Sequence, residues 1–303
     1  MQRQSVTELF EIYLAIKDYR ESSLEILGRA VRWYIRLNGD DISQSAVDDY
    51  RAWLKKGRAK SSANTYLRVL KPFFKWVTTR VRLPELQIKL YRAEAKQFKL
   101  YSPDEIQRMF DVADLRFKCI IALGLSGMRR SEILNLTVKE IDFEKAMVLL
   151  SPKRRTETTW PWEIKNGKMA YIGIPDYAVG WLSQMLEQIP TKQPYLLVPP
   201  EHYRKLIKLE KLSYTQRYCP FGNFNRKFNN LLKRAMVEPK RFHTLRDNFG
   251  TDQYREWKDI KIVQKLMRHS SIQTTANYIE SLDNQELAKK AAKLNKYYVT
   301  NEA

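Results

Sequence analysis

Cysteine and histidine are both scarce in this sequence. Its 303 residues include two cysteines and three histidines. Cys119 lies in the apolar run "CIIALGL" and Cys219 in a segment with proline and glycine. The two therefore provide neither a disulfide framework nor the ligand spacing of a zinc site. We expect reduced thiols, with Cys119 in the core.

Long apolar stretches are missing as well. No segment approaches the roughly 18 consecutive apolar residues that a membrane-spanning helix needs. The first ten residues, "MQRQSVTELF", hold no apolar signal-peptide core. Internal repeats and low-complexity tracts are also absent. The sequence therefore predicts a cytosolic protein, or a nuclear one in a eukaryote, that has no membrane partner.

Acidic residues are outnumbered by basic ones. The chain has 54 Lys and Arg against 34 Asp and Glu, a formal net charge of +20. The excess is spread along the chain, with 20 basic and 11 acidic residues in 1–100 and 34 and 23 in the remainder. A polyanion that contacts both parts, above all nucleic acid, would match this charge. A basic protein without such a partner is the alternative at this point.

The first 88 residues predict a compact helical domain. Apolar residues recur at helical spacing in four segments, which are 5–17, 23–39, 43–57 and 61–80. Pro72 should kink the last of them. The polar and basic stretch 89–101 predicts a linker. At its end Ser102 and Glu105 form a capping box that opens the next helix.

The remaining residues predict a mixed domain over 102–303. Three strands are expected at 146–151, 158–164 and 169–174, the last two joined by a turn at 165–168 that contains Asn-Gly. Helical segments surround them, at 103–113, 115–126, 130–137, 176–188, 199–210, 222–236, 243–255, 259–268, 271–279 and 284–296. The predicted fold class is mainly α with a small β-sheet (α+β).

Cutting a DNA strand with a protein hydroxyl requires a defined set of side chains. A tyrosine can attack phosphorus and form a covalent linkage, but its ordinary pKa near 10 means that it needs help to lose its proton. Guanidinium groups must meet the charge that develops on the phosphate oxygens. The leaving sugar oxygen needs a proton from a general acid. No metal ion is required.

The sequence contains this set. "HTLR" puts His243 and Arg246 three residues apart, on one face of the helix that they begin. Arg129 stands just before a predicted helix, where backbone N–H groups also favour anions, and Glu132 lies one turn further on. The turn at 165–168 presents Lys165 and Lys168 on an exposed arm. The segment "HSSIQTTANYIE" adds His269 and Tyr278.

In this order the segments resemble the tyrosine recombinase family, which includes Xer proteins and phage integrases. "SGMRRSEILNL" resembles its first arginine box, "HTLRDNFGT" its His-x-x-Arg box and "LMRHSSIQTTANYIE" its final box. The motifs cover about 60–303. The resemblance implies an N-terminal helical core-binding (SAM-like) domain over 1–88, a linker over 89–101 and a tyrosine-recombinase catalytic domain over 102–303.

The resemblance also implies a role for each residue. These roles are attack on the scissile phosphate by Tyr278, binding of its non-bridging oxygens by Arg129 and Arg246, assistance by His243 and His269 through hydrogen bonds and as base, and protonation of the leaving 5′-oxygen by Lys165. Glu132 is a secondary candidate from its position alone, one turn after Arg129, where it can hold that arginine or cap the helix. Lys153, just after the first strand, is the alternative lysine. The segment between the strands predicted at 146–151 and 169–174 is longer than usual for the family. Of all the residues matched to the family, this lysine therefore has the least support from the sequence motifs.

Two other positions depart from the family pattern. Arg268 stands before the last histidine, where the family usually has glycine, and a helix end prefers glycine there. The local turn could therefore differ. Asp247 replaces a second histidine after Arg246. Neither change removes a catalytic group.

The expected activity is site-specific recombination or integration of DNA through a covalent 3′-phosphotyrosyl intermediate, without a cofactor. The expected partners are double-stranded DNA and further copies of the chain, as a tetramer on two DNA sites in the cytoplasm, associated with the nucleoid. The helix within 284–299 would dock on a neighbouring protomer or on its own domain. The alternatives are a type IB topoisomerase-like enzyme that relaxes DNA and a catalytically inactive DNA-binding accessory protein.

Overall fold

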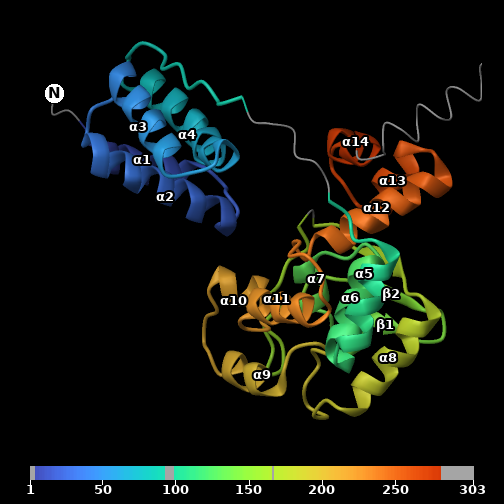
Figure 1. Cartoon of the computed structure of the whole chain (residues 1–303). Helices are drawn as coiled ribbons and strands as arrows, with labels where there is room; N and C mark the ends of the chain where they lie inside the picture. The colour runs from blue at the N-terminus through green and yellow to red at the C-terminus, as the bar shows by residue number, and fades with distance from the viewer. Residues whose placement is uncertain (1–3, 93–98, 166, 281–303) are drawn as a thin grey trace, which may run out of the picture. The chain divides into compact units, whose positions relative to one another are not determined.

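The computed structural model describes residues 4–92, 99–165 and 167–280, except for the side chains of Ser22 and of 277–280. The chain forms two compact units, Met1–Lys96 and Gln97–Ala303 (Figure 1). Part of the predicted linker, Asn166 in the predicted turn, and the predicted C-terminal helix lie outside the described residues. No helix in the described part of the chain is long and apolar enough to span a bilayer.

The first unit is helical, as the periodicity predicts. Its helices are α1 (Val6–Ile16), α2 (Glu21–Asn38), α3 (Gln44–Lys56) and α4 (Lys60–Arg80). They enclose one apolar core that includes the rings of Tyr13, Tyr34 and Phe73. Pro72 lies inside helix α4, and a kink at this residue stays a prediction.

The second unit consists of helices around a small sheet. Its helices are α5 (Pro103–Val112), α6 (Leu115–Leu125), α7 (Arg130–Leu134), η1 (Val138–Glu140), α8 (Asp176–Glu187), α9 (Pro200–Ile207), α10 (Tyr214–Tyr218), α11 (Phe224–Arg234), α12 (Thr244–Trp257), α13 (Ile260–Leu266) and α14 (Ile272–Glu280). The strands β1 (Ile141–Asp142), β2 (Met147–Leu150) and β3 (Ala170–Gly173) form an antiparallel sheet in the order β1-β2-β3. The predicted fold class, mainly α with a small β-sheet, is confirmed.

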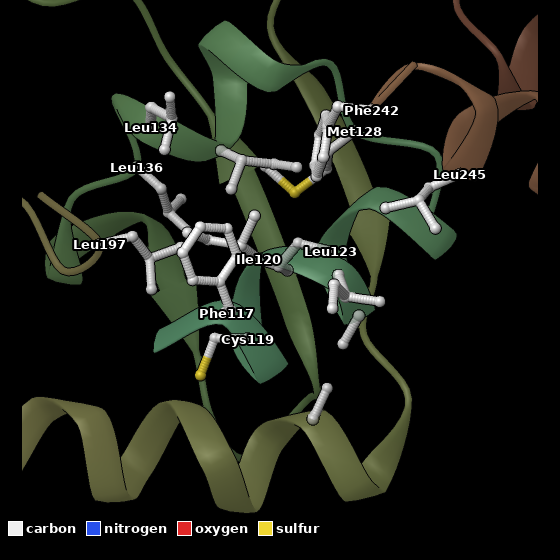
Figure 2. Packing of buried hydrophobic residues seen from close by; sticks show 14 of the residues in the cluster. Phe117, Cys119, Ile120, Leu123, Met128, Leu134, Leu136, Leu197, Phe242 and Leu245 are labelled. Carbon is white, nitrogen blue, oxygen red and sulfur yellow. The ribbon is translucent and has the colours of Figure 1, made fainter. Parts of the chain in front are cut away.

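Helix α6 is the centre of this unit. It packs against α8 and α12, and residues 119–124 are all buried. Figure 2 shows Cys119, Ile120 and Leu123 among the side chains of this core. The prediction that Cys119 is a core residue is confirmed, and burial raises the pKa of its thiol to about 12.

The connection between β2 and β3 differs from the prediction. The expected strand over 158–164, paired with 169–174, is wrong: β3 pairs with β2, with Val148 opposite Ile172. Residues 158–164 contribute only an isolated bridge between Trp162 and Lys153.

The reason for this difference lies in the side chain of Trp160. Its ring stacks on Tyr195 with 3.8 Å between centroids and an interplanar angle of 7°. Its Nε1 donates to Oδ1 of Asn135 at 2.8 Å. These contacts hold the segment in a small separate core rather than at the edge of the sheet.

Candidate active site

Arg129 is fixed at the start of α7 by Glu132. It is the N-cap residue of the helix. Oε2 of Glu132 accepts the backbone N–H of Arg129 at 2.8 Å, and Oε1 accepts Nη1 at 2.7 Å. The carboxylate is almost fully buried. One carboxylate therefore caps the helix and binds the guanidinium.

The turn before Arg129 needs glycine. Gly127 has φ +79°, and a Cβ atom there would lie 2.5 Å from the ring of Phe249. Its carbonyl oxygen faces the site and accepts hydrogen bonds from Arg246 and Arg268. The glycine thus allows the first arginine segment to approach α12 and the turn after α13.

Arg246 comes from the first turn of α12 and is 1% exposed. Its Nη1 donates to the carbonyl of Gly127 and its Nη2 to the carbonyl of Met267. His243, the N-cap residue of the same helix, is exposed. Its Nε2 lies 3.9 Å from Oδ1 of Asp247, the residue that departs from the family pattern.

The turn between α13 and α14 presents His269. Arg268 adopts the left-handed conformation, with φ +52°, and the backbone N–H of His269 donates to the carbonyl of Gln264 at 3.1 Å. The turn is therefore a left-handed helix end, although arginine replaces the glycine that such an end prefers. Nδ1 of His269 is hydrogen-bonded to the hydroxyl of Thr275 at 3.1 Å.

The three sequence boxes meet at this turn. Arg246 donates to the carbonyl of Met267, and Nη2 of Arg129 donates to the carbonyl of Arg268 at 3.1 Å. The structure thus brings together Arg129, Arg246 and the segment that carries His269. The backbone of Tyr278 lies in α14, and its side chain is outside the described residues.

Both histidines sit among positive charges. Desolvation, and then the charges of Arg246, Arg129 and Lys165, lower the pKa of His243 to about 4. Desolvation, followed mainly by Arg246 and Arg129, lowers the pKa of His269 to about 4. Both imidazoles are therefore neutral at pH 7.

The two candidate lysines lie in different surroundings. Nζ of Lys153 is 2.8 Å from a carboxylate oxygen of Glu140, and both side chains are buried. The same ammonium lies 4.6 Å from the ring centroid of Trp162. Lys165 is exposed, and its charge contributes to the lowered pKa of His243. Its ammonium therefore lies within electrostatic reach of that imidazole.

Arg268 belongs to this site in a way that the sequence does not predict. Its Nη2 donates to Oε2 of Glu132 at 2.7 Å and to the carbonyl of Gly127 at 3.0 Å. The signal in the sequence was an arginine at a helix end that prefers glycine. Among the described residues, no three His, Cys, Asp or Glu side chains gather as ligands for a metal ion.

Comparisons with known proteins identify one family. The family model described as "Phage integrase family" matches residues 99–285. The chain is 24% identical over 299 residues to a protein named tyrosine recombinase XerA from Thermococcus kodakarensis, covering 95% of each chain. It is 26% identical over 284 residues to an integrase/recombinase from Escherichia coli, covering 83% of this chain and 82% of the other.

Solved structures show the same fold. One is the Tn1549 transposon integrase in complex with circular intermediate DNA, with a TM-score of 0.69, 18% identity and coverage of 91% of this chain and 95% of that one. Another is a lambda integrase dimer bound to a core site, with a TM-score of 0.66, 14% identity and the same coverage.

Proposed function

The chain belongs to the phage integrase family and is a tyrosine-type site-specific recombinase that acts on DNA, and from this premise we propose how its residues divide the reaction. Tyr278 attacks the scissile phosphate and forms a 3′-phosphotyrosyl linkage, which keeps the bond energy for rejoining. The step releases a 5′-hydroxyl. Neither ATP nor a metal ion enters this scheme.

Arg129 and Arg246 bind the non-bridging oxygens of the phosphate. The observation that carries this proposal is the meeting of both guanidinium groups at the turn after α13, through hydrogen bonds to the carbonyls of Arg268 and Met267. Two neighbouring guanidinium groups can each donate paired hydrogen bonds to the phosphate oxygens, and they stabilise the negative charge that grows on these oxygens in the transition state. Glu132 keeps Arg129 in position.

His243 and His269 act next to the phosphate as hydrogen-bonding groups and as the base for the tyrosine. Their lowered pKa values keep both imidazoles neutral at pH 7, the form that can hydrogen-bond to the phosphate or to the tyrosine hydroxyl. We assign the role of base for the tyrosine proton to these two residues because they are the neutral imidazoles beside the two arginines, and the low pKa itself makes them weaker bases. Lys165 donates the proton to the leaving 5′-oxygen. Its exposure and its electrostatic effect on His243 favour it over Lys153, whose ammonium is bound to Glu140 in a buried ion pair.

Duplex DNA is the substrate, and further copies of the chain are the partners. We assign 1–88 to the core-binding domain, 89–101 to the linker and 102–303 to the catalytic domain. The charge of +20 supports phosphate contacts by both domains. The working assembly is a tetramer on two DNA sites in the cytoplasm, in which the C-terminal segment 284–299 docks on a neighbouring protomer.

The experiment that tests this proposal uses a nicked DNA site, from which the cut strand cannot be rejoined. Candidate sites come from the sequences that flank the gene. The wild-type chain should form an adduct that survives detergent, and Tyr278→Phe should bind the site but form none. The matched control is Tyr177→Phe, which removes a hydroxyl but keeps the ring that packs on Phe110 and Trp181.

The alternatives give different results. Relaxation of supercoiled plasmid without any recombination site would identify a topoisomerase-like enzyme. Binding of the site without an adduct by the wild-type chain would identify an accessory protein. An adduct with Tyr278→Phe would contradict the assignment of the nucleophile.

A further inference from the structure

We propose that Arg268 is a positioning residue for the reaction, which couples the two phosphate-binding arginines through one guanidinium nitrogen. This inference rests on the proposed function. In the structure, Nη2 of Arg268 contacts Oε2 of Glu132 at 2.7 Å and the carbonyl of Gly127 at 3.0 Å. No group on the substrate need contact Arg268 for this role.

The two acceptors of Arg268 are also the acceptors of the arginines that it would position. Glu132 receives both the backbone N–H and Nη1 of Arg129. The carbonyl of Gly127 receives Nη1 of Arg246. Arg268 therefore binds both the carboxylate that orients Arg129 and the carbonyl that orients Arg246.

The contact with Glu132 is buried and charged. The side chain of Glu132 is 1% exposed and that of Arg268 is 15% exposed. Burial alone would raise the pKa of Glu132, but the charges of Arg268 and then Arg129 lower it overall. Removal of one cation leaves the buried carboxylate with less compensation, so that it can move or take up a proton. Either change would release Arg129 from its present orientation.

The backbone conformation of the turn does not favour arginine at position 268. The left-handed conformation at φ +52° is easier for glycine than for any residue with a Cβ atom. Arginine at this position therefore strains the turn, and what it adds is the set of side-chain contacts. The same residue also contributes its carbonyl oxygen to Nη2 of Arg129, and this acceptor is present whatever the side chain.

Three substitutions at position 268 distinguish the effect of the backbone conformation from the effect of the guanidinium group. Arg268→Gly eases the turn and removes the cation. Arg268→Ala keeps the strained turn and removes the cation. Arg268→Lys keeps the turn and a positive charge. The measurements are the single-turnover rate of adduct formation on the nicked site at saturating protein, and the equilibrium affinity for the same DNA.

We expect Arg268→Gly and Arg268→Ala to slow adduct formation about 10- to 100-fold while their affinity for the site stays unchanged, because the reacting groups are misplaced but still present. Arg268→Lys should recover part of the rate. In a Glu132→Gln background the further effect of Arg268→Gly should be smaller than in the wild type, because the two residues act through one contact.

A wild-type rate for Arg268→Gly would overturn the inference, since it would mean that only the turn matters. Equal rates for the lysine and alanine variants would also overturn it. Arg268→Gly does not depend on a strained turn, so the test remains available if Arg268→Ala fails to fold. Absence of an adduct from the wild-type chain would instead contradict the proposed function and is seen before any variant is compared.

Discussion

Nη2 of Arg129 donates a hydrogen bond to the carbonyl oxygen of Arg268, 3.1 Å away, across 139 positions of the sequence. The bond joins the first arginine segment to the turn that presents His269. Arg246 makes the corresponding contact with the carbonyl of Met267. The backbone of one turn therefore sets the positions of both proposed phosphate-binding groups, and changes to this turn should affect the reaction more than DNA binding.

Gly127→Ala should destabilise the catalytic unit. A Cβ atom would lie 2.5 Å from the ring of Phe249, at a φ of +79°, so we expect a loss of about 1–3 kcal/mol of unfolding free energy. Urea unfolding measures this loss. The control is Gly180→Ala in α8, where a Cβ atom meets nothing within 4 Å and helix propensity predicts a neutral or stabilising effect. Equal effects of the two substitutions would refute the steric argument.

Lys153→Ala should lower the stability of the protein, whereas Lys165→Ala should lower the rate of strand cleavage. Loss of Lys153 leaves Glu140 buried without its cation, although Ser151 and Thr137 still donate to it. We expect a cost of about 3 kcal/mol in stability. Lys165→Ala should leave stability unchanged and slow strand cleavage. The exposed Lys168→Ala on the same arm is the control for a general loss of positive charge.

The role of Lys165 as general acid can be tested separately from binding. A 5′-bridging sulfur in place of the leaving oxygen needs little protonation, so this substrate should restore cleavage by Lys165→Ala. Cleavage of the sulfur substrate by Lys165→Ala that remains as slow as that of ordinary DNA would rule out the general-acid role. The same substrate should leave the defect of Arg246→Ala in place, because that arginine acts on the non-bridging oxygens.

Stability should fall between pH 7.5 and 5.5, in part because of the two site histidines. Their pKa is about 4 in the folded protein, against about 6.5 in an unfolded chain. In this window the unfolded state binds more protons, so the free energy of unfolding decreases as the pH is lowered. For His269 the expected share is about 1 kcal/mol or less after solvent screening.

Urea unfolding of wild type and His269→Gln at both pH values measures this share. The variant should lose less stability than the wild type on acidification. His243→Gln should show a smaller effect, because its side chain is 55% exposed and more strongly screened. Identical pH dependence in wild type and His269→Gln would contradict the lowered pKa of that histidine.

Local signals in the sequence predicted much of the fold. The helices of the first unit follow from their apolar periodicity. The capping box between Ser102 and Glu105 forms as predicted, with both hydrogen bonds present. Helix α10 was missed because it has five residues, too few to show a helical period.

Contacts between distant residues could not be predicted in the same way. Residues 158–164 alternate like a strand, with Trp160, Trp162 and Ile164 buried, but their position is decided by Tyr195 and Asn135. The sequence also predicted the arginine and histidine boxes as separate motifs. The link that Arg268 makes to Glu132 spans 136 positions and is visible only after folding.

The most direct test of the central claim is the identity of the residue that carries the DNA. The adduct on the nicked site is digested with nuclease and protease, and the nucleotide-linked peptide is sequenced by tandem mass spectrometry. The proposed reaction predicts one modified residue, Tyr278, joined to the 3′-phosphate of the cut strand. A linkage at any other residue, or to a 5′-phosphate, would contradict it.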